Sequence, residues 1–291
     1  PASPPTMKSM LASSVSSLRL TGRHLARVPR RCSQITCSRT FCSHSEMQAA
    51  ALIIGDEVLS GSVVDTNSPW LCKLLHARGV DMVRMEFVRD RKEEIQESVL
   101  RLKSMVGQNG IVFTSGGIGP THDDITYDAI ASAFGRKLSV HSETLKRMKA
   151  HYDTKGLEVN ESRLRMATLP EDCDVLFCED TWVPLVVVEG VHILPGIPRL
   201  FQTMVSAQKH RFEGAQFHAV SLFTSVGEGI LAEPLSAVAK KHAGVRIGSY
   251  PKGVEGDYKV KIMVEGHDSE LVRAAVADVE LAVTIDSKEE H

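Results

Sequence analysis

The sequence predicts an α/β protein in which a three-layer domain with a mostly parallel sheet is followed by a smaller α/β unit. Two observations lead to this prediction. Short apolar runs alternate with helical patterns between residues 50 and 135, which is typical of parallel βαβ units with helices on both sheet faces. After about residue 206 the pattern changes to strand, helix, two successive strands and helix, which favours a small antiparallel sheet.

The first 45 residues differ in composition from the rest of the chain. They contain seven Lys or Arg and no Asp or Glu, although all 291 residues together have a formal net charge of -2. A segment rich in Ser and Arg that lacks acidic residues is typical of an organelle transit peptide. We therefore exclude it from the fold and expect a mitochondrial matrix protein, with plastid or cytoplasm as alternatives.

The same basic leader has a second interpretation, a disordered arm that binds nucleic acid, but we expect no nucleic-acid partner. We also expect no membrane partner. The longest apolar runs are shorter than the ~20 residues that a membrane-spanning helix needs.

Three pairs of strand and helix open the folded part. Each strand is a short apolar run, and each helix has apolar residues three or four positions apart. Thr66, Asn67 or Ser68 can cap the first helix, in which Pro69 suits the first turn. The predicted strands are residues 50–54, 80–88 and 110–115, and the helices follow at about 66–78, 91–106 and 124–134.

The later elements complete two predicted domains. A capped helix begins near Ser142, and a hairpin of two strands turns at Glu189-Gly190 before a Pro195-Gly196 turn and another helix. The second unit holds strands at 217–223, 244–250 and 258–266 and helices at 227–242 and 269–283. The expected divisions are a leader at 1–45, the parallel-sheet domain at 46–205, the smaller unit at 206–285 and a tail at 286–291.

Three loops follow the carboxyl ends of the first three strands. Ligands bind at this edge of a parallel sheet, where successive loops converge. The first loop and the start of its helix contain Asp56, Glu57, Asp65 and Asn67, the second contains Asp90, and the third is "GGIGPTHDD" at 116–124.

The third loop combines glycines with two adjacent carboxylates. Gly116, Gly117 and Gly119 remove side chains, so that backbone N–H groups and the positive end of the following helix can face a phosphate. Asp123 and Asp124 would repel that phosphate unless a divalent cation lay between them or one carboxylate acted on a nucleophile. This predicts metal-assisted chemistry on a phosphoryl or pyrophosphate bond. The alternative is that Asp123 or Asp124 caps the helix and the glycines only turn the chain.

Three segments resemble a known family. "TSGGIGPTHDDIT", together with "IIGDEVLSGSVVDTN" upstream and "LPGIPRLF" downstream, resembles the MoaB/Mog-type molybdopterin-binding fold. The two-unit pattern is similar to CinA-like proteins. It is most similar to the amino-terminal molybdopterin-binding-like domain of eukaryotic FAD synthase, because of "QFHAVSLF", "GSYP" and "YKVKI" in the second unit. The resemblance covers residues 49 to 285.

The resemblance implies a divalent-metal-dependent pyrophosphatase that acts on FAD, ADP-ribose or a similar dinucleotide. Its metal would be Mg, Mn or Co, and Asp90 and Asp124 would be the catalytic and metal-binding residues. The implied ligand-binding residues are Gly116, Gly117, Gly119, Thr121 and Asp123, faced by Asp56, Glu57, Asp65 and Asn67.

The alternatives are a module that binds molybdopterin or adenylates it, and a non-catalytic binding or assembly domain. In either case we expect a small-molecule nucleotide or pterin ligand and a homo-oligomer. Two features depart from the family pattern. No segment up to His291 resembles the domain that makes FAD in FAD synthase, so we do not expect this chain alone to synthesise FAD. Arg89-Asp90 also stands where relatives commonly have Pro-Asp.

Overall fold

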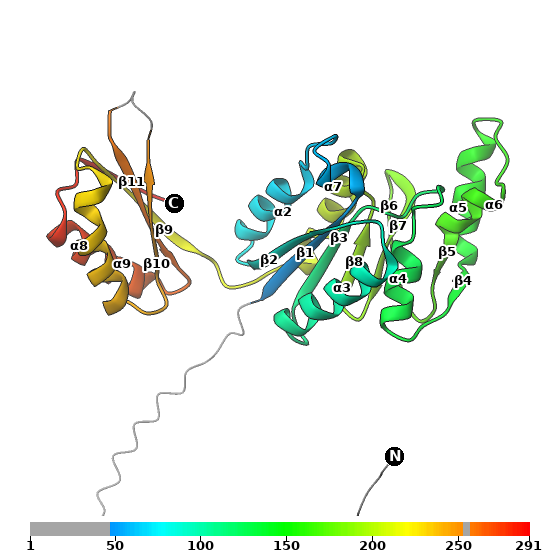
Figure 1. The fold of residues 1–291 in the computed structure, drawn as a ribbon, viewed down its shortest axis with the longest axis horizontal. Coiled ribbons are helices and arrows are strands. Elements are labelled where there is room, and N and C mark those ends of the chain that lie inside the picture. Colours follow the sequence, from blue (N-terminus) through cyan, green and yellow to red (C-terminus); the bar gives the residue numbers. More distant parts are fainter. Residues whose placement is uncertain (1–46, 253–256) are drawn as a thin grey trace, which may run out of the picture. The chain divides into compact units, whose positions relative to one another are not determined.

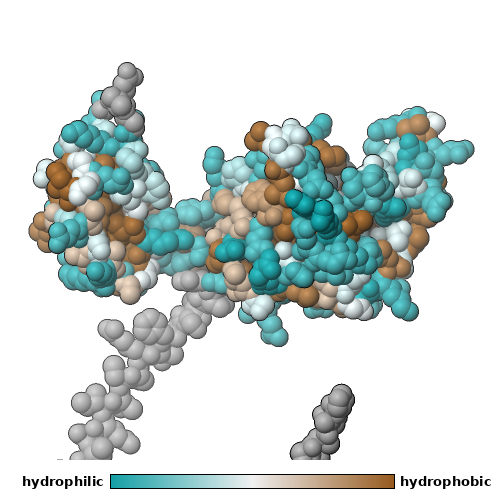
Figure 2. Space-filling view, viewed as in Figure 1, coloured by the Kyte–Doolittle hydropathy of each residue, from teal (hydrophilic) through white to brown (hydrophobic). Residues whose placement is uncertain are grey.

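The structure is a computed structural model of the chain, and it describes residues 47–252 and 257–291. The transit-peptide prediction for residues 1–45 lies outside these ranges. Within them, none of the helices has the length and hydrophobicity needed to cross a lipid bilayer. On the surface, hydrophilic and hydrophobic residues are interspersed (Figure 2).

A six-stranded sheet forms the centre of the first domain and confirms the mostly parallel prediction. Its strand order is β2-β1-β3-β8-β7-β6, in which the first four strands are parallel and the last two run antiparallel to their neighbours (Figure 1). The strands are β1 (Gln48–Ile54), β2 (Asp81–Val88), β3 (Ile111–Ser115), β6 (Asp174–Cys178), β7 (Thr181–Val188) and β8 (Val191–Leu194).

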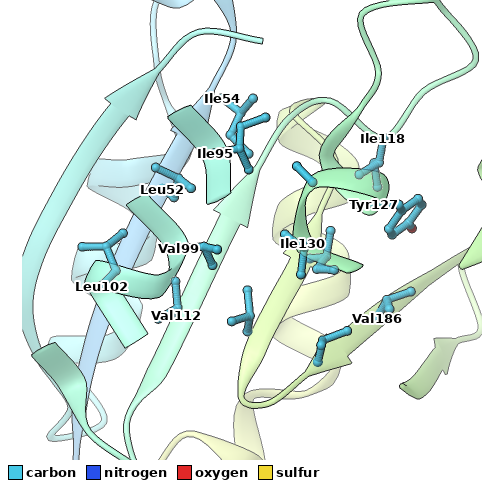
Figure 3. Close-up of a cluster of buried hydrophobic side chains, with 14 of the residues drawn as sticks. Leu52, Ile54, Ile95, Val99, Leu102, Val112, Ile118, Tyr127, Ile130 and Val186 are labelled. Atoms are coloured by element: carbon cyan, nitrogen blue, oxygen red, sulfur yellow. The ribbon is translucent and has the colours of Figure 1, made fainter. Parts of the chain in front are cut away.

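Helices cover both faces of this sheet, as predicted for three layers (Figure 1). Because side chains alternate along a strand, Leu52 and Ile54 of β1 pack on one face with Ile95 of α3 (Figure 3). Ala49 and Ala51 pack on the opposite face, in a core that α2 and α7 complete. The helices are α1 (Asp56–Leu59), α2 (Asn67–His76), α3 (Lys92–Val106), α4 (Thr126–Ala133) and α7 (Pro198–Ala207).

The middle segment adds a two-stranded sheet and two helices. The helix predicted near Ser142 is present, but its capping group is the ring of His141, which accepts a hydrogen bond from the Thr144 N–H. The hairpin at Glu189-Gly190 is also confirmed, since both residues have positive φ, 50° and 80°, as a two-residue turn requires. The elements are β4 (Leu138–Val140), α5 (Ser142–Asp153), α6 (Glu161–Leu164), the 3₁₀ helix Arg165–Ala167 and β5 (Thr168–Pro170).

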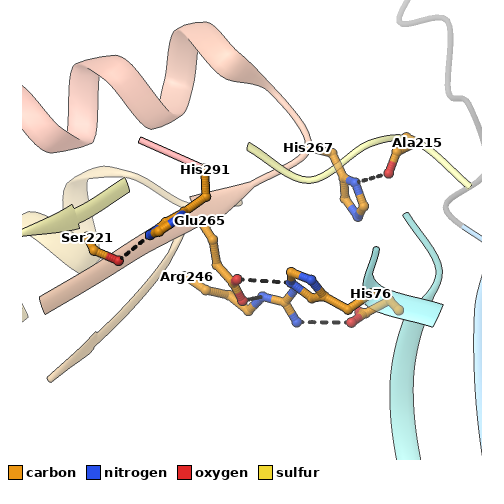
Figure 4. Close-up of polar contacts among 8 residues, drawn as sticks. His76, Ala215, Ser221, Arg246, Glu265, His267 and His291 are labelled. Atoms are coloured by element: carbon orange, nitrogen blue, oxygen red, sulfur yellow. Dashed lines mark hydrogen bonds and ion pairs between the residues drawn. The ribbon is translucent and has the colours of Figure 1, made fainter. Parts of the chain in front are cut away.

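The second domain is built on a four-stranded antiparallel sheet of order β10-β11-β9-β12, which confirms the smaller α/β unit. The predicted tail contains a strand, β12, which pairs with β9. Beyond it, His291 is hydrogen-bonded to Ser221 (Figure 4). A separate 3₁₀ helix, Lys209–Arg211, precedes the domain. Its elements are β9 (His218–Thr224), α8 (Glu228–Lys241), β10 (Arg246–Pro251), β11 (Val260–Gly266), α9 (Ser269–Ala282) and β12 (Ser287–Glu290).

Candidate functional site

Asp90 joins the three predicted loops at the carboxyl edge of the parallel strands. Its Oδ2 accepts a hydrogen bond of 2.9 Å from the N–H of Asp56, which ties the end of β2 to the start of α1. A Cβ atom built on Gly117 would lie 3.6 Å from its Oδ1. Asp90 therefore faces the glycine loop. It does not cap α3, whose N-cap position is Arg91 and has no side-chain capping bond.

Gly116 and Gly117 are required by close packing and by positive φ angles of 116° and 66°. A Cβ on Gly116 would lie 2.1 Å from the Ile54 carbonyl oxygen, and one on Gly117 would lie 2.3 Å from Thr126 Oγ1. The Gly116 N–H donates to the Leu194 carbonyl at 3.1 Å. The expectation that this N–H faces a phosphate is therefore wrong, because the sheet already uses it.

Helix α4 begins at Thr126, two residues later than predicted. Thr126 ties the helix to the glycine loop, since its N–H donates to the Gly117 carbonyl and its hydroxyl to the Gly116 carbonyl, each at 2.9 Å. The N-cap residue, Ile125, makes no side-chain cap. Neither Asp123 nor Asp124 caps this helix, so the capping alternative is wrong.

The Asp124 carboxylate closes its own turn instead. Its Oδ2 accepts hydrogen bonds from the Thr121 hydroxyl and, at 2.7 Å, from the Thr121 N–H. A Cβ on Gly119 would lie 2.7 Å from the same oxygen, so Gly119 leaves room for this carboxylate. The N–H groups of residues 117, 118 and 119 make no hydrogen bond to another described residue. The N–H groups of His122 and Asp123 likewise have no such bond, but residues 117, 118 and 119 are the ones that line the cavity beside the loop.

A cavity of about 580 Å³ opens beside the glycine loop. Its charged lining residues in the described chain are both acidic, Glu57 and Asp124, and no Lys or Arg lines it there. Four further lining residues, from the middle segment and β7, are apolar or aromatic, namely Tyr152, Met166, Trp182 and Val183. The remaining lining residues are Val63, Gly116, Gly117, Ile118, Gly119, Pro120, Pro195, Gly196, Ile197, Pro198 and Leu200.

Sequence reasoning missed Tyr152 and Trp182. Neither residue lies in a loop that follows a parallel strand, since Tyr152 lies in the last turn of α5 and Trp182 is the second residue of β7. The hairpin turn at Glu189-Gly190 was the available signal, because it reverses the chain and returns the start of β7 to the carboxyl edge of β8.

Two predicted ligand residues make hydrogen bonds within the protein. The Oδ1 of Asp65 accepts the N–H groups of Asn67 at 3.0 Å and Ser68 at 3.2 Å, so Asp65 caps α2 in place of the expected Thr66, Asn67 or Ser68. Asn67 is only 4% exposed. Its Nδ2 donates to Ser115 Oγ at 2.9 Å and to the Gly196 carbonyl at 3.0 Å, which links β3 to the loop before α7.

The structure places the remaining predicted residues at the surface of the same region. Thr121, Asp123, Asp56 and Glu57 are exposed. Burial raises the pKa of the Asp90 carboxyl above its ordinary value, as do the nearby charges of Glu57, Asp56 and Asp123. The hydrogen bond from Asp56 acts in the opposite direction. Four carboxylates that interact in this way form an acidic cluster.

This acidic cluster fits a hard divalent cation only if the ligand completes the coordination. Carboxylate oxygens suit Mg²⁺ and Mn²⁺. Among the described residues, however, no three His, Cys, Asp or Glu side chains converge closely enough to hold a metal ion. Mg²⁺ commonly binds through one or two carboxylates, several waters and substrate phosphates, so a site shared with a ligand fits the residues present.

The sheet topology and the glycine loop with carboxylates beside it define an α/β small-molecule-binding domain. Comparison with known proteins gives the particular family. Residues 50–212 match the family described as "Probable molybdopterin binding domain", and the chain belongs to that family. Residues 216–289 match the family described as "FAD synthase, middle domain". The resemblance found in the sequence is thereby confirmed.

Individual relatives agree with this assignment. The chain is 31% identical over 256 residues to the "Probable FAD synthase" of Caenorhabditis elegans, across 79% of this chain and 49% of the relative. It is 29% identical to a "Putative competence-damage inducible protein" of Alkaliphilus oremlandii, across 76% of this chain and 54% of the relative. The chain thus spans about half the length of each. The crystal structure of CinA from Thermoplasma acidophilum superposes with a TM-score of 0.51 at 28% identity, and covers 57% of this chain and 97% of CinA.

Proposed function

We propose that this chain is a divalent-metal-dependent pyrophosphatase that hydrolyses the diphosphate of FAD, ADP-ribose or a similar dinucleotide. The observation that carries the proposal is the charge of the cavity. Two carboxylates and no described basic residue line it, together with residues 117–119, whose N–H groups make no hydrogen bond to another described residue. A diphosphate bound there needs a cation to offset the repulsion between it and the carboxylates.

The proposed reaction adds one water across the P–O–P bond. The bridging P–O bond breaks, the water oxygen bonds to one phosphorus, and the products are two monophosphates with release of protons. FAD would yield FMN and AMP, and ADP-ribose would yield ribose 5-phosphate and AMP. No oxidant or reductant is consumed.

The residues of the chain would divide this work between them. A bound divalent cation supplies charge neutralisation and lowers the pKa of water that it binds. The N–H groups of residues 117–119 would hold phosphoryl oxygens as negative charge develops on them. Asp90, held by the Asp56 N–H, would supply a carboxylate to the cation. Asp124, held by Thr121, keeps the turn that presents the loop.

A pterin-binding or pterin-adenylating module is the second candidate, because the matched family is described as molybdopterin-binding. A pterin is a flat aromatic ring system, and the aromatic wall of the cavity suits it. In this case the chain would retain or adenylate the ligand without releasing AMP from a dinucleotide.

Product analysis separates the two functions. Protein lacking residues 1–45 is incubated with FAD, ADP-ribose or NAD and with Mg²⁺, Mn²⁺ or Co²⁺, and the products are separated by chromatography. We expect AMP from the wild type and a loss of about 100-fold or more in Asp90→Asn, since catalytic acid–base and metal-binding groups have effects of this size. Glu97→Gln, a matched change on the exposed surface of α3, should retain full activity. Survival of every dinucleotide with every metal would contradict the proposal.

A further inference from the structure

The cavity has an aromatic end that the chemistry at the glycine loop does not use. Trp182 and Tyr152 line it with ring centroids 6.1 Å apart, and both are partly exposed. His151 lies beside them, with its ring 6.1 Å from Trp182 and 5.6 Å from Tyr152. Met166 and Val183, which also line the cavity, are apolar.

Sheet topology brings this aromatic end to the ligand edge. Strand β8 is parallel to β3, so both strands end at the same edge as the glycine loop. Strand β7 is antiparallel to β8, with Val186 opposite Ile193 and Val188 opposite Val191. The first residues of β7 therefore lie at the edge where the parallel strands end. Trp182 is the second residue of β7 and faces the cavity there.

Two arginines pack against aromatic rings in this region. The Arg163 guanidinium lies 4.6 Å from the centre of the Tyr152 ring, which leaves one face of that ring covered by protein. The Arg147 guanidinium of α5 lies 4.0 Å from the centre of the Phe177 ring, on the strand β6 next to β7. This contact anchors α5 to the hairpin that carries Trp182. A preorganised pair of rings loses little conformational entropy when a ligand binds.

The cavity lining contains both polar and aromatic groups, as a nucleotide contains both a phosphate and a flat base. Its volume of about 580 Å³ falls within the ~300–1,000 Å³ usual for sites of small organic ligands and cofactors. Its lining combines N–H donors and carboxylates, which suit a phosphate with its cation, and the flat π surfaces of Trp182 and Tyr152. Stacking on an indole or phenol ring accepts any flat base, because every base has a π face.

We propose that Trp182 and Tyr152 form a stacking site for the flat heteroaromatic ring of the ligand, a flavin or an adenine. These two residues make the chain select ligands that carry such a ring next to phosphate. The inference rests on the proposed function only for the phosphate and cation that would bind at the glycine loop. The stacking itself is measured by binding, without turnover.

The chain offers a direct optical test, because it contains two tryptophans. Trp70 packs edge-on against Phe201, 6.2 Å away, and does not line the cavity. In a Trp70→Phe background Trp182 is the remaining tryptophan, and its fluorescence is titrated with FMN, AMP and ribose 5-phosphate in the presence of Mg²⁺. We expect saturable quenching by FMN or AMP, and whichever binds more tightly identifies the ring. Ribose 5-phosphate, which lacks a ring, should leave the emission unchanged.

Substitutions then measure the contribution of the ring by calorimetry. Trp182→Ala should weaken binding of the quenching nucleotide by about 10- to 100-fold, whereas Trp182→Phe should retain most of the affinity. Tyr250→Ala is the matched control, because it truncates an exposed aromatic residue of the second domain that does not line the cavity. Its affinity should equal that of the wild type. Near-UV circular dichroism verifies that each variant is folded.

The outcomes separate this inference from the hydrolase proposal. Binding that depends on Trp182 while every dinucleotide stays intact supports the stacking site and overturns hydrolysis. Release of AMP with the same KM in wild type and Trp182→Ala supports hydrolysis and overturns the stacking site. Absence of quenching by both FMN and AMP also overturns the stacking site.

Discussion

At the residue scale, the site depends on Asp90, a partly buried carboxylate with other carboxylates close to it. Asp90 receives the Asp56 N–H, lies next to Gly117 and interacts with the charges of Glu57 and Asp123. Burial and these like charges raise its pKa because both disfavour the ionised form. An acidic cluster of this kind destabilises the empty site and favours a bound cation.

The raised pKa of Asp90 leads to a prediction about stability and pH. A carboxyl group whose pKa is higher in the folded state stabilises the fold below its unfolded pKa, and this contribution is lost as pH rises through the folded value. Asp90→Asn removes that loss and keeps an oxygen that can accept the Asp56 N–H. In EDTA, we therefore expect the variant to melt at a higher temperature than the wild type at neutral pH, with the difference shrinking on acidification.

Added Mg²⁺ provides the counterpart of this experiment. At pH values above the raised pKa of Asp90, Mg²⁺ should raise the melting temperature of the wild type. It should have little effect on the melting temperature of Asp90→Asn. Melting curves from pH 4 to 8 with and without Mg²⁺ measure both effects. A variant that is less stable than wild type in EDTA at neutral pH would show that the Asp56–Asp90 hydrogen bond outweighs the repulsion.

At the element scale, the first long helix is held by a side chain that lies outside it. Asp65 precedes α2 by two residues, yet its carboxylate accepts the N–H groups of Asn67 and Ser68. Thr66 occupies the N-cap position without a side-chain bond. Asp65→Ala should therefore lower the free energy of unfolding by about 1 kcal/mol, the usual cost of losing a cap.

The neighbouring substitution Thr66→Ala is the control for the cap, and we expect it to change stability by only a few tenths of a kcal/mol. Urea denaturation of the two variants measures the difference. A larger loss of unfolding free energy for Thr66→Ala than for Asp65→Ala would show that Thr66, and not Asp65, caps the helix. Nucleotide affinity should persist in Asp65→Ala if its carboxylate acts as a cap and not as a ligand.

The same scale shows why element types were predictable while some boundaries were not. The apolar spacing of Ile95, Val99 and Leu102 predicts α3, since these residues face the core. The start of α4 depends on Thr126, whose two bonds reach back to Gly116 and Gly117, nine or ten residues earlier. Local capping rules contain no information about such contacts.

At the scale of the whole molecule, the described chain has separate hydrophobic cores. Those of the parallel sheet use residues between 49 and 212, and that of the second domain uses residues between 220 and 283. No residue belongs to the cores of both. Each domain therefore has the apolar packing that cooperative folding requires.

This separation predicts that residues 47–215 fold when expressed alone. The fragment keeps Phe212 in its core and keeps the hydrogen bond from the Gly214 N–H to the Arg78 carbonyl. We expect a single cooperative thermal transition and retained quenching of Trp182 by the nucleotide that quenches it in the longer chain. Loss of near-UV circular dichroism in the fragment would instead show that the second domain is needed for its fold.

The sequence by itself determined the fold class, the types of most elements, the glycine loop and the family. Each of these depends on local patterns, which are apolar periodicity and contiguous motifs such as "TSGGIGPTHDDIT". Only the tertiary structure decided which residues line the cavity. It placed Asp90 against Gly117, used Asp65 and Asn67 as structural contacts, and brought Trp182 to the ligand edge. The physical reason is that these contacts join residues far apart in the chain, so they depend on strand order and direction, which no short stretch of sequence contains.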